Sequence, residues 1–566
     1  MRTVAVRCID RGTTIATLVR EKNLSGHVRL HGGTMNNLLR SASVALGLTA
    51  IYLIRIIDPL IEANHTVVYH WSGRPLVLFG PVALNFIAVW AVLTLLLLLV
   101  QAPGRARVAV WGAILCFTPS IILQDLALLP FFKPAHWERS TLAILGTATY
   151  CLLLVLLLWR PAFAAKFDRL IGFVSTVLQF VAISGAIFLF QFAKSGWQAR
   201  SLNDQMQSHP SRIAPVKTKP RIIWVVLDEL SYQQIYVDRY QGLQLPAFDA
   251  LANEATLFTH PIPASIPIDT NIRTEKILPS LMTGKPVDDL NATPAGQLSI
   301  HNPDAGAWQS FDQHDTVFQD ALNNGYRTAV AGWYNPYCRL LPAVLDHCFW
   351  AFSDNSQSGM LPDETLASNL PQPILSFVES RGLPRSLQKL LPQRPSDPEI
   401  HIADYQNLAD AADKILRDPS LDFVFLHLPV PHPGGIYNRK TGELTTGPST
   451  YVDNLALADK YLAHLRSTLE QGGQWDSSTV VIMGDHGWRI MEWNGAAEWT
   501  AEEQNASHGG RYDNRPAYIV KLAGQQKGTR IDTPFHALNT RKLLDALLTQ
   551  NIRSAEDLSA WAQQAH

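Results

Sequence analysis

The sequence predicts an α/β domain with a mostly parallel central sheet, preceded by a transmembrane domain of five helices. Three observations carry this prediction. The first third of the chain holds five apolar stretches that are long enough to cross a bilayer. After residue 220, short apolar strands alternate with helical patterns, which is typical of a parallel sheet covered by helices. Only 17% of the 566 residues are charged, as expected of a chain that is partly embedded in a membrane.

The five apolar stretches cover residues 38–57, 76–100, 108–132, 141–159 and 170–192. Basic residues are concentrated before the first stretch and in the loops after the second and fourth, whereas the opposite loops carry only Arg74, Lys133 and Arg139. Because basic loops stay in the cytoplasm, we expect a cytoplasmic amino terminus, and five crossings place the chain after residue 193 outside. The expected parts are a cytoplasmic segment at 1–34, a transmembrane domain at 35–193, a linker at 194–220 and an extracytoplasmic domain at 221–566.

Two charged residues interrupt the apolar stretches. Arg55 lies near the end of the first stretch and Asp125 near the end of the third. Both lie at a similar depth, close to the outer interface, so we expect them either to snorkel to the interface or to form an ion pair at the membrane edge. The alternative is that they line the path of a lipid headgroup.

Two apolar strands in the second part of the chain end in possible metal ligands. The run 479–483 leads into Gly484-Asp485-His486-Gly487, and the run 221–227 leads into Asp228 and Glu229. Open α/β sheets place their ligand sites at the carboxyl ends of the strands, so these groups are expected at one edge of the sheet. Carboxylate and imidazole together suit zinc or manganese.

Three further positions carry polar groups in contexts that point to chemistry. Thr274 precedes a predicted helix that stops at Thr283-Gly284, and its hydroxyl needs a base or a metal to act as a nucleophile. The apolar run 423–428 contains His427 and leads to His432, although histidines at strand ends are often structural. His508 lies in a Ser-His-Gly-Gly segment, and its alternative is a residue of a flexible loop.

These motifs stand in an order that resembles the alkaline phosphatase and sulfatase superfamily, and more narrowly its membrane-bound phosphoethanolamine and phosphoglycerol transferases. The resemblance extends from about residue 221 to residue 508. It implies that Thr274 is the nucleophile and that it completes a metal site with Asp228, Asp485 and His486. Glu229 is a further ligand candidate, with a solvated turn residue as the alternative. Sulfatases carry a cysteine where Thr274 stands, so this chain is expected to perform phosphoryl chemistry.

The resemblance also assigns roles to the other polar residues. It implies that His427 and His432 bind the phosphoryl group or a second metal, so one or two ions are expected. His508 would complete a second metal site or act as acid and base. Lys276 would hold phosphoryl oxygens, and its alternative is an exposed helix residue.

The expected function is metal-dependent transfer of a phospholipid headgroup, phosphoethanolamine or phosphoglycerol, through a phosphothreonine to a lipid or glycan acceptor of the cell envelope. A membrane-tethered phosphodiesterase or sulfatase-like hydrolase with the same site is the alternative. A transporter or an inactive scaffold is disfavoured by the complete metal set and by the lack of paired repeats. The resemblance implies a monomer in the bacterial inner membrane with a periplasmic catalytic domain. The formal net charge of -1 gives no basis for nucleic-acid binding.

Two cysteines lie in the outer domain, Cys338 and Cys348. An extracytoplasmic location favours a disulfide between them, and the alternative is a pair of buried thiols. Neither possibility makes them catalytic.

Overall fold

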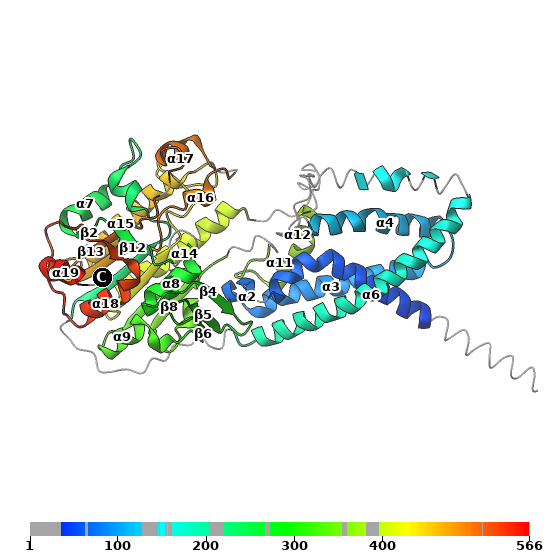
Figure 1. Cartoon of the computed structure of the whole chain (residues 1–566), viewed down its shortest axis with the longest axis horizontal. Helices are drawn as coiled ribbons and strands as arrows, with labels where there is room; N and C mark the ends of the chain where they lie inside the picture. The colour runs from blue at the N-terminus through cyan, green and yellow to red at the C-terminus, as the bar shows by residue number, and fades with distance from the viewer. Residues whose placement is uncertain are drawn as a thin grey trace, which may run out of the picture. The chain divides into compact units, whose positions relative to one another are not determined.

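The computed structural model describes most of the chain, and it divides into two compact units (Figure 1). The described residues are 35–62, 66–126, 145–146, 148–152, 155–156, 161–202, 219–265, 272–353, 359–380, 395–496, 499–511 and 513–564. The helical unit comprises residues 1–58, 79–194 and 366–392. The α/β unit comprises residues 59–78, 195–365 and 393–566.

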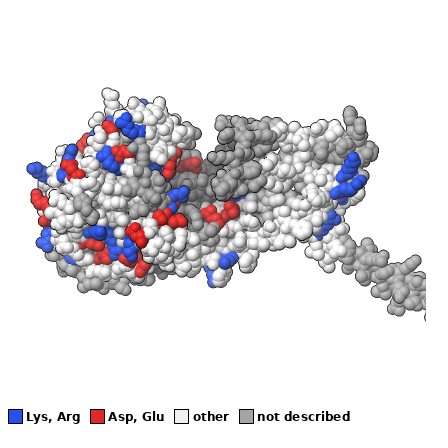
Figure 2. All heavy atoms as spheres, in the orientation of Figure 1, with Lys and Arg blue, Asp and Glu red and all other residues white. Residues whose placement is uncertain are grey.

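Long apolar helices form the first part of the chain. Within the described residues, four helices are long and apolar enough to cross a membrane: Met35–Ile61, Pro75–Leu99, Arg105–Asp125 and Lys166–Ala199. The last three lie in α3 (Pro75–Leu99), α4 (Arg105–Leu126) and α6 (Pro161–Ala199). The predicted stretch at 141–159 lies largely outside the described residues. The helical unit shows a broad uncharged surface in Figure 2, as a lipid-facing surface requires.

The predicted ion pair between Arg55 and Asp125 is present, with 3.8 Å between Arg55 Nε and Asp125 Oδ1. Two short helices of the later chain, α11 (Leu366–Asn369) and α12 (Gln372–Ser380), also belong to the helical unit. The Asn85 amide of α3 donates to the Leu370 carbonyl at 2.6 Å. A segment that follows β7 and β8 in the chain is therefore part of the helical unit.

The α/β unit contains an eight-stranded sheet with the order β14-β2-β13-β12-β1-β9-β7-β8. The five neighbours β12, β1, β9, β7 and β8 run parallel, and β13 runs antiparallel to β12 and β2. The predicted mostly parallel sheet is thus confirmed. The strands are β1 (Arg221–Leu227), β2 (Thr256–Phe258), β7 (Thr328–Trp333), β8 (His347–Ala351), β9 (Phe423–Leu428), β12 (Ser478–Gly484), β13 (Tyr518–Lys521) and β14 (Thr529–Ile531).

The sheet is buried on both faces because its central strands are apolar at most positions. In β1, Trp224 points into one core and Val225 into the other, following the two-residue period of a strand. The core that contains Trp224 is covered by α8 (Thr274–Thr283), α9 (Val317–Asn323) and α18 (Thr540–Leu548). The core that contains Val225 is covered by α7 (Pro246–Glu254), α14 (Asp397–Arg417) and α15 (Tyr451–Gln471).

Smaller elements complete this unit. The short helices are α2 (Thr66–His70), α10 (Tyr337–Leu340), α16 (Ile490–Trp493), α17 (Ala501–Ala506) and α19 (Ala555–Ala562), with single turns at η2 (Gln233–Val237), η3 (Gln313–Asp315) and η4 (Ala537–Asn539). One small sheet contains β4 (Asp289–Ala292), β5 (Leu298–Asn302) and β6 (Ala307–Ser310). A second pairs β10 (Tyr437–Asn438) with β11 (Glu443–Leu444), and a third pairs β3 (Pro261–Ile262) with β15 (Phe535–His536).

The segment between the first two membrane helices is built into the α/β unit. The buried Arg339 guanidinium donates to the Tyr69 carbonyl at 3.0 Å and to the Trp71 carbonyl, and it lies 4.9 Å from the Trp350 ring. Tyr69 belongs to the core of the α/β unit. The division predicted at residue 193 therefore differs from the structure at residues 59–78, which belong to the later unit.

Cys338 and Cys348 form a disulfide. The bond joins α10 to β8 across a sequence separation of 10 residues. The structure thus decides between the two possibilities for these cysteines in favour of the covalent link.

Candidate metal centre

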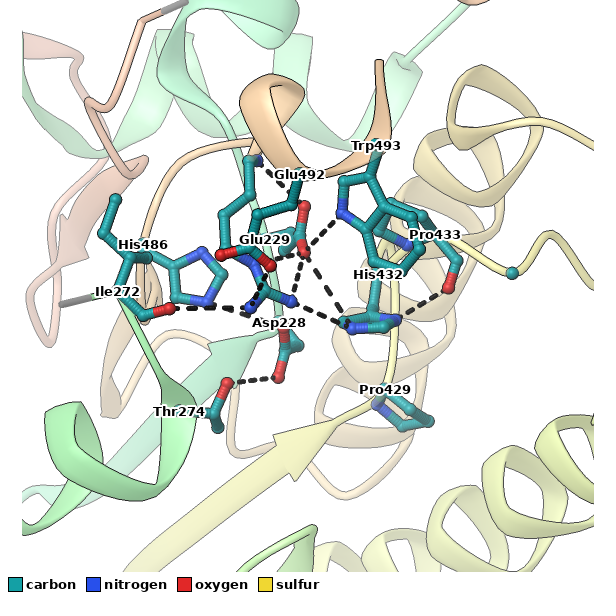
Figure 3. A network of polar contacts seen from close by, with 12 residues as sticks. Asp228, Glu229, Ile272, Thr274, Pro429, His432, Pro433, His486, Glu492 and Trp493 are labelled. Carbon is teal, nitrogen blue, oxygen red and sulfur yellow. Dashed lines mark hydrogen bonds and ion pairs between the residues drawn. The ribbon is translucent and has the colours of Figure 1, made fainter. Parts of the chain in front are cut away.

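Three neighbouring strands bring the predicted ligands together at one edge of the sheet. In the register, Leu227 of β1 lies beside Gly484 of β12 on one side and Leu428 of β9 on the other. Asp228 and Asp485, which directly follow two of these residues, therefore meet although they are far apart in the chain. Figure 3 shows Asp228 between Thr274, His486 and His432.

The two glycines of the Gly-Asp-His-Gly turn are needed because backbone approaches them closely. A Cβ on Gly484 would lie 2.6 Å from the Leu230 carbonyl oxygen, and one on Gly487 would lie 2.8 Å from the Asn514 carbonyl carbon. Asp485 Oδ1 accepts bonds from two backbone N–H groups: that of His486 in the same turn at 2.9 Å, and that of Glu229 after β1 at 3.1 Å. These bonds leave Asp485 Oδ2 directed at the site.

Thr274 is the first residue of α8, and its hydroxyl faces both carboxylates. Its Oγ1 lies 2.9 Å from Asp485 Oδ2 and 3.1 Å from Asp228 Oδ2. The side chain is buried, so few other groups compete for this hydroxyl. The helix amino terminus adds a partial positive charge that favours negative charge on the Thr274 oxygen.

His427 and His486 are buried, and each ring has its Nε2 atom facing this cluster. His486 Nδ1 lies 2.9 Å from the Gly487 carbonyl, and His427 Nδ1 lies 2.9 Å from the Trp333 carbonyl. Each ring donates its Nδ1 proton to a carbonyl, so the Nε2 lone pair is left for a cation. His486 Nε2 lies 3.1 Å from Asp485 Oδ2, and His427 Nε2 lies 3.6 Å from Asp228 Oδ2.

The donor set fits a divalent metal. Asp228, Asp485 and His486 offer ligand atoms within 4.8 Å of one another, and all three are buried. Within the described residues, Asp228 Oδ1, His427 Nε2 and His486 Nε2 are buried polar atoms without a hydrogen-bond partner, and a bound cation would satisfy them. Two carboxylates and two imidazoles with the Thr274 hydroxyl are ligands that zinc and manganese accept.

The electrostatics of the cluster agree with cation binding. Burial opposes ionisation of Asp228, but the neighbouring His427, His432 and His486 outweigh it and lower the pKa of Asp228 below its usual range. Burial also opposes protonation of His486, yet the Asp485 carboxylate raises the pKa of His486 to about 9. The metal-free site therefore holds a proton on His486 at neutral pH, and a metal would replace that proton.

Glu229 is held by an arginine that the sequence analysis missed. Its carboxylate accepts bonds from the Arg489 backbone N–H at 3.0 Å and from Arg489 Nε at 2.7 Å, and from Trp493 Nε1 at 3.1 Å. Glu229 has a φ of 62°, which is unusual for a residue with a side chain. A backbone strained in this way beside a functional group is typical of active sites.

Arg489 is a cation that faces the reaction centre. Its Nη2 lies 3.2 Å from His432 Nε2, and His432 Nε2 lies 3.9 Å from Glu229 Oε1. Asp228, Glu229 and His432 form a second group that could hold a metal ion. Glu229 is thus either a ligand of that group or the carboxylate that orients Arg489. The sequence pointed to Arg489 only by its position shortly after the Asp-His turn.

The remaining predicted residues lie further out. Lys276 donates to the Asp288 carbonyl at 2.9 Å and lies 3.7 Å from Asp289. The His508 side chain is half exposed, with its Nε2 3.7 Å from Asp238 Oδ2. The structure brings together Asp228, Glu229, Thr274, His427, His432, Asp485 and His486, while the contacts described for Lys276 and His508 involve other residues.

Arg489→Met is expected to lower kcat/KM by about 10²-fold or more, because a charged donor beside the metal cluster is lost. The single change also leaves Glu229 buried without its partner, which costs about 3 kcal/mol or more of stability. The double variant Glu229→Gln with Arg489→Met is therefore the matched control. We expect it to regain thermal stability without regaining activity, and full activity in this double variant would exclude a role for Arg489 in the reaction.

Comparison with known proteins supports the fold. A family model described as Sulfatase matches residues 220–521, which is more than half of the chain. No curated protein matches the chain. Among solved structures, the lipoteichoic acid synthase LtaP from Listeria monocytogenes is 15% identical with a TM-score of 0.33, covering 63% of this chain and 79% of that chain.

Two further solved structures are similar at the same level. The phosphonate monoester hydrolase of Agrobacterium radiobacter is 14% identical with a TM-score of 0.35, covering 58% of this chain and 74% of that chain. The sulfatase PsFucS1 from Pseudoalteromonas sp. is 15% identical with a TM-score of 0.38, covering 62% of this chain and 70% of that chain. These scores are too low to transfer an activity. The matched region contains Asp228, Thr274, Asp485 and His486, and the chain belongs to the sulfatase family.

Proposed function

We propose that this protein is a metal-dependent phosphotransferase that moves a phospholipid headgroup onto Thr274 and then onto an acceptor hydroxyl. The observation that carries the proposal is the Thr274 hydroxyl, which lies within 3.1 Å of both carboxylates of the metal cluster. A threonine at this position provides a hydroxyl nucleophile for phosphorus. It cannot become the oxidised cysteine on which sulfate ester hydrolysis in this family depends.

A divalent cation held by Asp228, Asp485, His486 and His427 would lower the pKa of the Thr274 hydroxyl and offset charge on the phosphoryl oxygens. Thr274 Oγ forms a bond to phosphorus while the bond from phosphorus to the diacylglycerol oxygen breaks. The Thr274 proton is passed to that leaving oxygen. Arg489 lies at the outer side of the cluster, where it would bind the phosphoryl oxygens.

The second step reverses the first with a different alcohol. The acceptor oxygen forms a bond to phosphorus, the bond from phosphorus to Thr274 Oγ breaks, and the acceptor proton returns to Thr274. His432 donates Nδ1–H to the Pro433 carbonyl at 2.7 Å, so its Nε2 carries the lone pair that faces Arg489 Nη2 at 3.2 Å. In the proposal the acceptor hydroxyl replaces Arg489 at this atom, and His432 takes its proton. His508 stays a sequence prediction for the same role.

The membrane anchor supports a lipid donor, because a diacyl lipid leaves the bilayer only at a high cost in free energy. The proposal places the anchor in the bacterial inner membrane and the α/β unit in the periplasm. Zinc is the preferred metal and manganese the alternative, with one or two ions. The donor is a phosphoethanolamine or phosphoglycerol lipid.

The orientation of the α/β unit is tested with a reporter fused after His566. Because basic residues gather in the loops expected inside, alkaline phosphatase fused there should be active and green fluorescent protein should be dark. A fusion at residue 103, in a loop expected inside, is the control and should show the opposite pattern. A fluorescent carboxyl-terminal fusion would contradict the proposed orientation.

Transfer is distinguished from hydrolysis with purified full-length protein and a fluorescent phosphatidylethanolamine or phosphatidylglycerol. In the absence of an acceptor, transfer predicts release of diacylglycerol in an amount close to that of the enzyme and a phosphodiester adduct on Thr274. Intact-protein mass spectrometry detects the adduct. Continuous release of the free headgroup with no adduct would favour the hydrolase.

A further inference from the structure

A cavity of about 760 Å³ opens beside the metal cluster within the α/β unit. His432 is part of its wall, and so is Tyr334, whose hydroxyl donates to Glu275 at 2.9 Å. Glu275 directly follows Thr274. The cavity therefore reaches the histidine that takes a proton in the proposed second step, and through Tyr334 it contacts the residue that follows the nucleophile. We call it the aromatic cavity because aromatic side chains form much of its wall.

Five large aromatic side chains line the cavity: Trp333, Tyr334, Phe352, Trp493 and Trp499. Trp333 is central, with ring centroids 5.5 Å from Tyr334, 5.7 Å from Phe352 and 5.4 Å from His432. The His432 ring lies 5.5 Å from Trp493 in turn. These contacts join four of the five aromatic side chains and His432 into one continuous wall, and Figure 3 shows its end at Trp493 and His432. Trp499 stands apart from these contacts.

The charges around the cavity disfavour an anionic occupant. Its lining, as far as the described residues form it, contains carboxylates and histidines but no lysine or arginine. A phosphorylated glycan, a uronic acid polymer or a polyphosphate would meet Asp397 at the rim without a compensating cation. A neutral occupant avoids this cost.

The same carboxylates are poorly suited to hold a cation. Asp404 accepts bonds from Ser353 Oγ at 2.7 Å, Ser353 N at 3.0 Å and Trp333 Nε1 at 3.3 Å. Glu503 accepts bonds from the Tyr451 and Thr500 backbones, both at 2.9 Å. Both side chains are engaged in holding the walls, and the cavity is much larger than a cage for one ammonium group.

The polar part of the lining suits an occupant with many hydroxyl groups. Gly434, Gly435 and Gly447 expose backbone, and Ser449 and Thr500 add hydroxyls at the same wall. Aromatic faces carry partial negative charge and attract the polarised C–H face of a sugar ring, while backbone and hydroxyl groups bond its rim. Ser449 already donates to the Tyr437 carbonyl at 2.6 Å and Thr500 to Glu503 at 3.0 Å, so each hydroxyl has its oxygen left to accept a further bond. An acyl chain would use the aromatic wall but make no bond to these oxygens or to the glycine backbone.

We propose that the aromatic cavity binds the acceptor and that the acceptor is a neutral oligosaccharide, with one sugar hydroxyl placed against His432. This inference rests on the proposed transfer to an acceptor hydroxyl and specifies its substrate class. In the reaction, the sugar oxygen forms a bond to phosphorus, the bond from phosphorus to Thr274 Oγ breaks, and the sugar proton passes through His432 to Thr274 Oγ.

Trp499 is the residue to change, because it lines the cavity and is not itself part of the metal cluster. Its Nε1 donates to Gln504 at 2.7 Å, and its ring stacks on Trp488 at 5.4 Å. Trp499→Ala should weaken binding of the oligosaccharide and raise its KM by at least about tenfold, since an aromatic ring of the binding wall is removed. Trp499→Phe keeps a ring and should recover most of the affinity. Trp308→Ala removes an exposed tryptophan outside the cavity and is the matched control.

The experiment uses full-length protein in nanodiscs and needs no donor for its first part. Isothermal titration measures binding of neutral gluco-, galacto- and manno-oligosaccharides, of uronic acid oligomers and of choline. At least one neutral set should bind, and Trp499→Ala should weaken it while Trp308→Ala should not. Binding of the uronic acids or choline alone, no binding of any neutral set, or equal effects of the two alanine variants would overturn the proposal.

Release of diacylglycerol from the fluorescent donor is measured on the same preparation. If neutral sugars bind and no diacylglycerol is released under any condition, the proposed function fails and the cavity assignment stands. If diacylglycerol is released and no neutral sugar binds or accelerates turnover, the cavity assignment fails alone.

Discussion

Replacing Thr274 with alanine is expected to abolish turnover, with a loss in kcat of about 10⁴-fold or more. The Thr274 oxygen is the atom that forms the bond to phosphorus in the proposed first step, and it lies 2.9 Å from Asp485 Oδ2. Removal of a nucleophile leaves only the rate enhancement that comes from binding and charge stabilisation. Diacylglycerol release from the fluorescent donor measures the loss.

Thr274→Ser is the matched control because it keeps the hydroxyl and removes only a methyl group. We expect it to retain measurable turnover and to form the phosphodiester adduct, which Thr274→Ala should not form. The fold of the alanine variant is checked by the thermal unfolding midpoint and by the intact disulfide between Cys338 and Cys348. Undiminished turnover in Thr274→Ala would rule out this nucleophile, and the next candidate, Thr270, lies outside the described residues.

Loss of the metal is expected to have an effect of similar size. Asp485→Asn should lower both metal content and activity by about 10³-fold or more, because the carboxylate contacts Thr274, His486 and the Glu229 backbone. Chelation of the unmodified protein should abolish activity, and zinc or manganese should restore it. Elemental analysis of the purified active protein measures occupancy. Active protein that contains no transition metal would contradict the mechanism.

Asp459→Asn is the matched control for this change. Asp459 is also buried and accepts a bond from the Phe248 backbone at 2.9 Å, and burial raises its pKa to about 6. Burial thus disfavours the charged form, and an amide oxygen could still accept the Phe248 bond at this position, which lies on α15 away from the strand ends. We expect Asp459→Asn to keep both its metal and its activity.

The same site predicts how metal affinity depends on pH. Because the Asp485 carboxylate raises the pKa of His486 to about 9 in the metal-free protein, a bound metal must displace a proton at any lower pH. The apparent metal affinity should then fall by about tenfold for each pH unit below 9, since one proton competes for the site. Titration of metal-free protein at pH 6, 7 and 8 would measure this slope, and a flat profile would exclude His486 as the ligand.

Much of this architecture follows from local sequence. The strands β1, β9 and β12 were predicted because nearly all of their residues are apolar or β-branched, and such a run is typical of a buried parallel strand. The side chains after two of these strands were predicted to meet because the carboxyl ends of parallel strands share one edge. The apolar anchor was also predicted from local sequence, because each apolar stretch is long enough to span the hydrocarbon core of a bilayer.

Other features depended on side chains that approach from distant parts of the chain. Arg489 binds Glu229 across 260 positions, and the sequence alone carries no sign of this pair. Lys276 was predicted to hold phosphoryl oxygens, but its ammonium group donates to the Asp288 carbonyl in the segment that follows α8. His508 follows the Asp-His turn in sequence, yet its described ion pair is with Asp238.

The place of Thr274 beside the metal ligands was expected only from the family resemblance. The sequence by itself determined the α/β class of the domain, the apolar anchor, and the positions of Asp228, Asp485 and His486 at strand ends. Each of these depends on periodicity or on a position next to a strand or helix end, which are properties of a few consecutive residues. Tertiary structure alone decided the disulfide, the place of residues 59–78 in the α/β unit, the Arg489 ion pair and the aromatic cavity. These features depend on the direction in which packed side chains point, and that direction is set only when distant segments fill the same space.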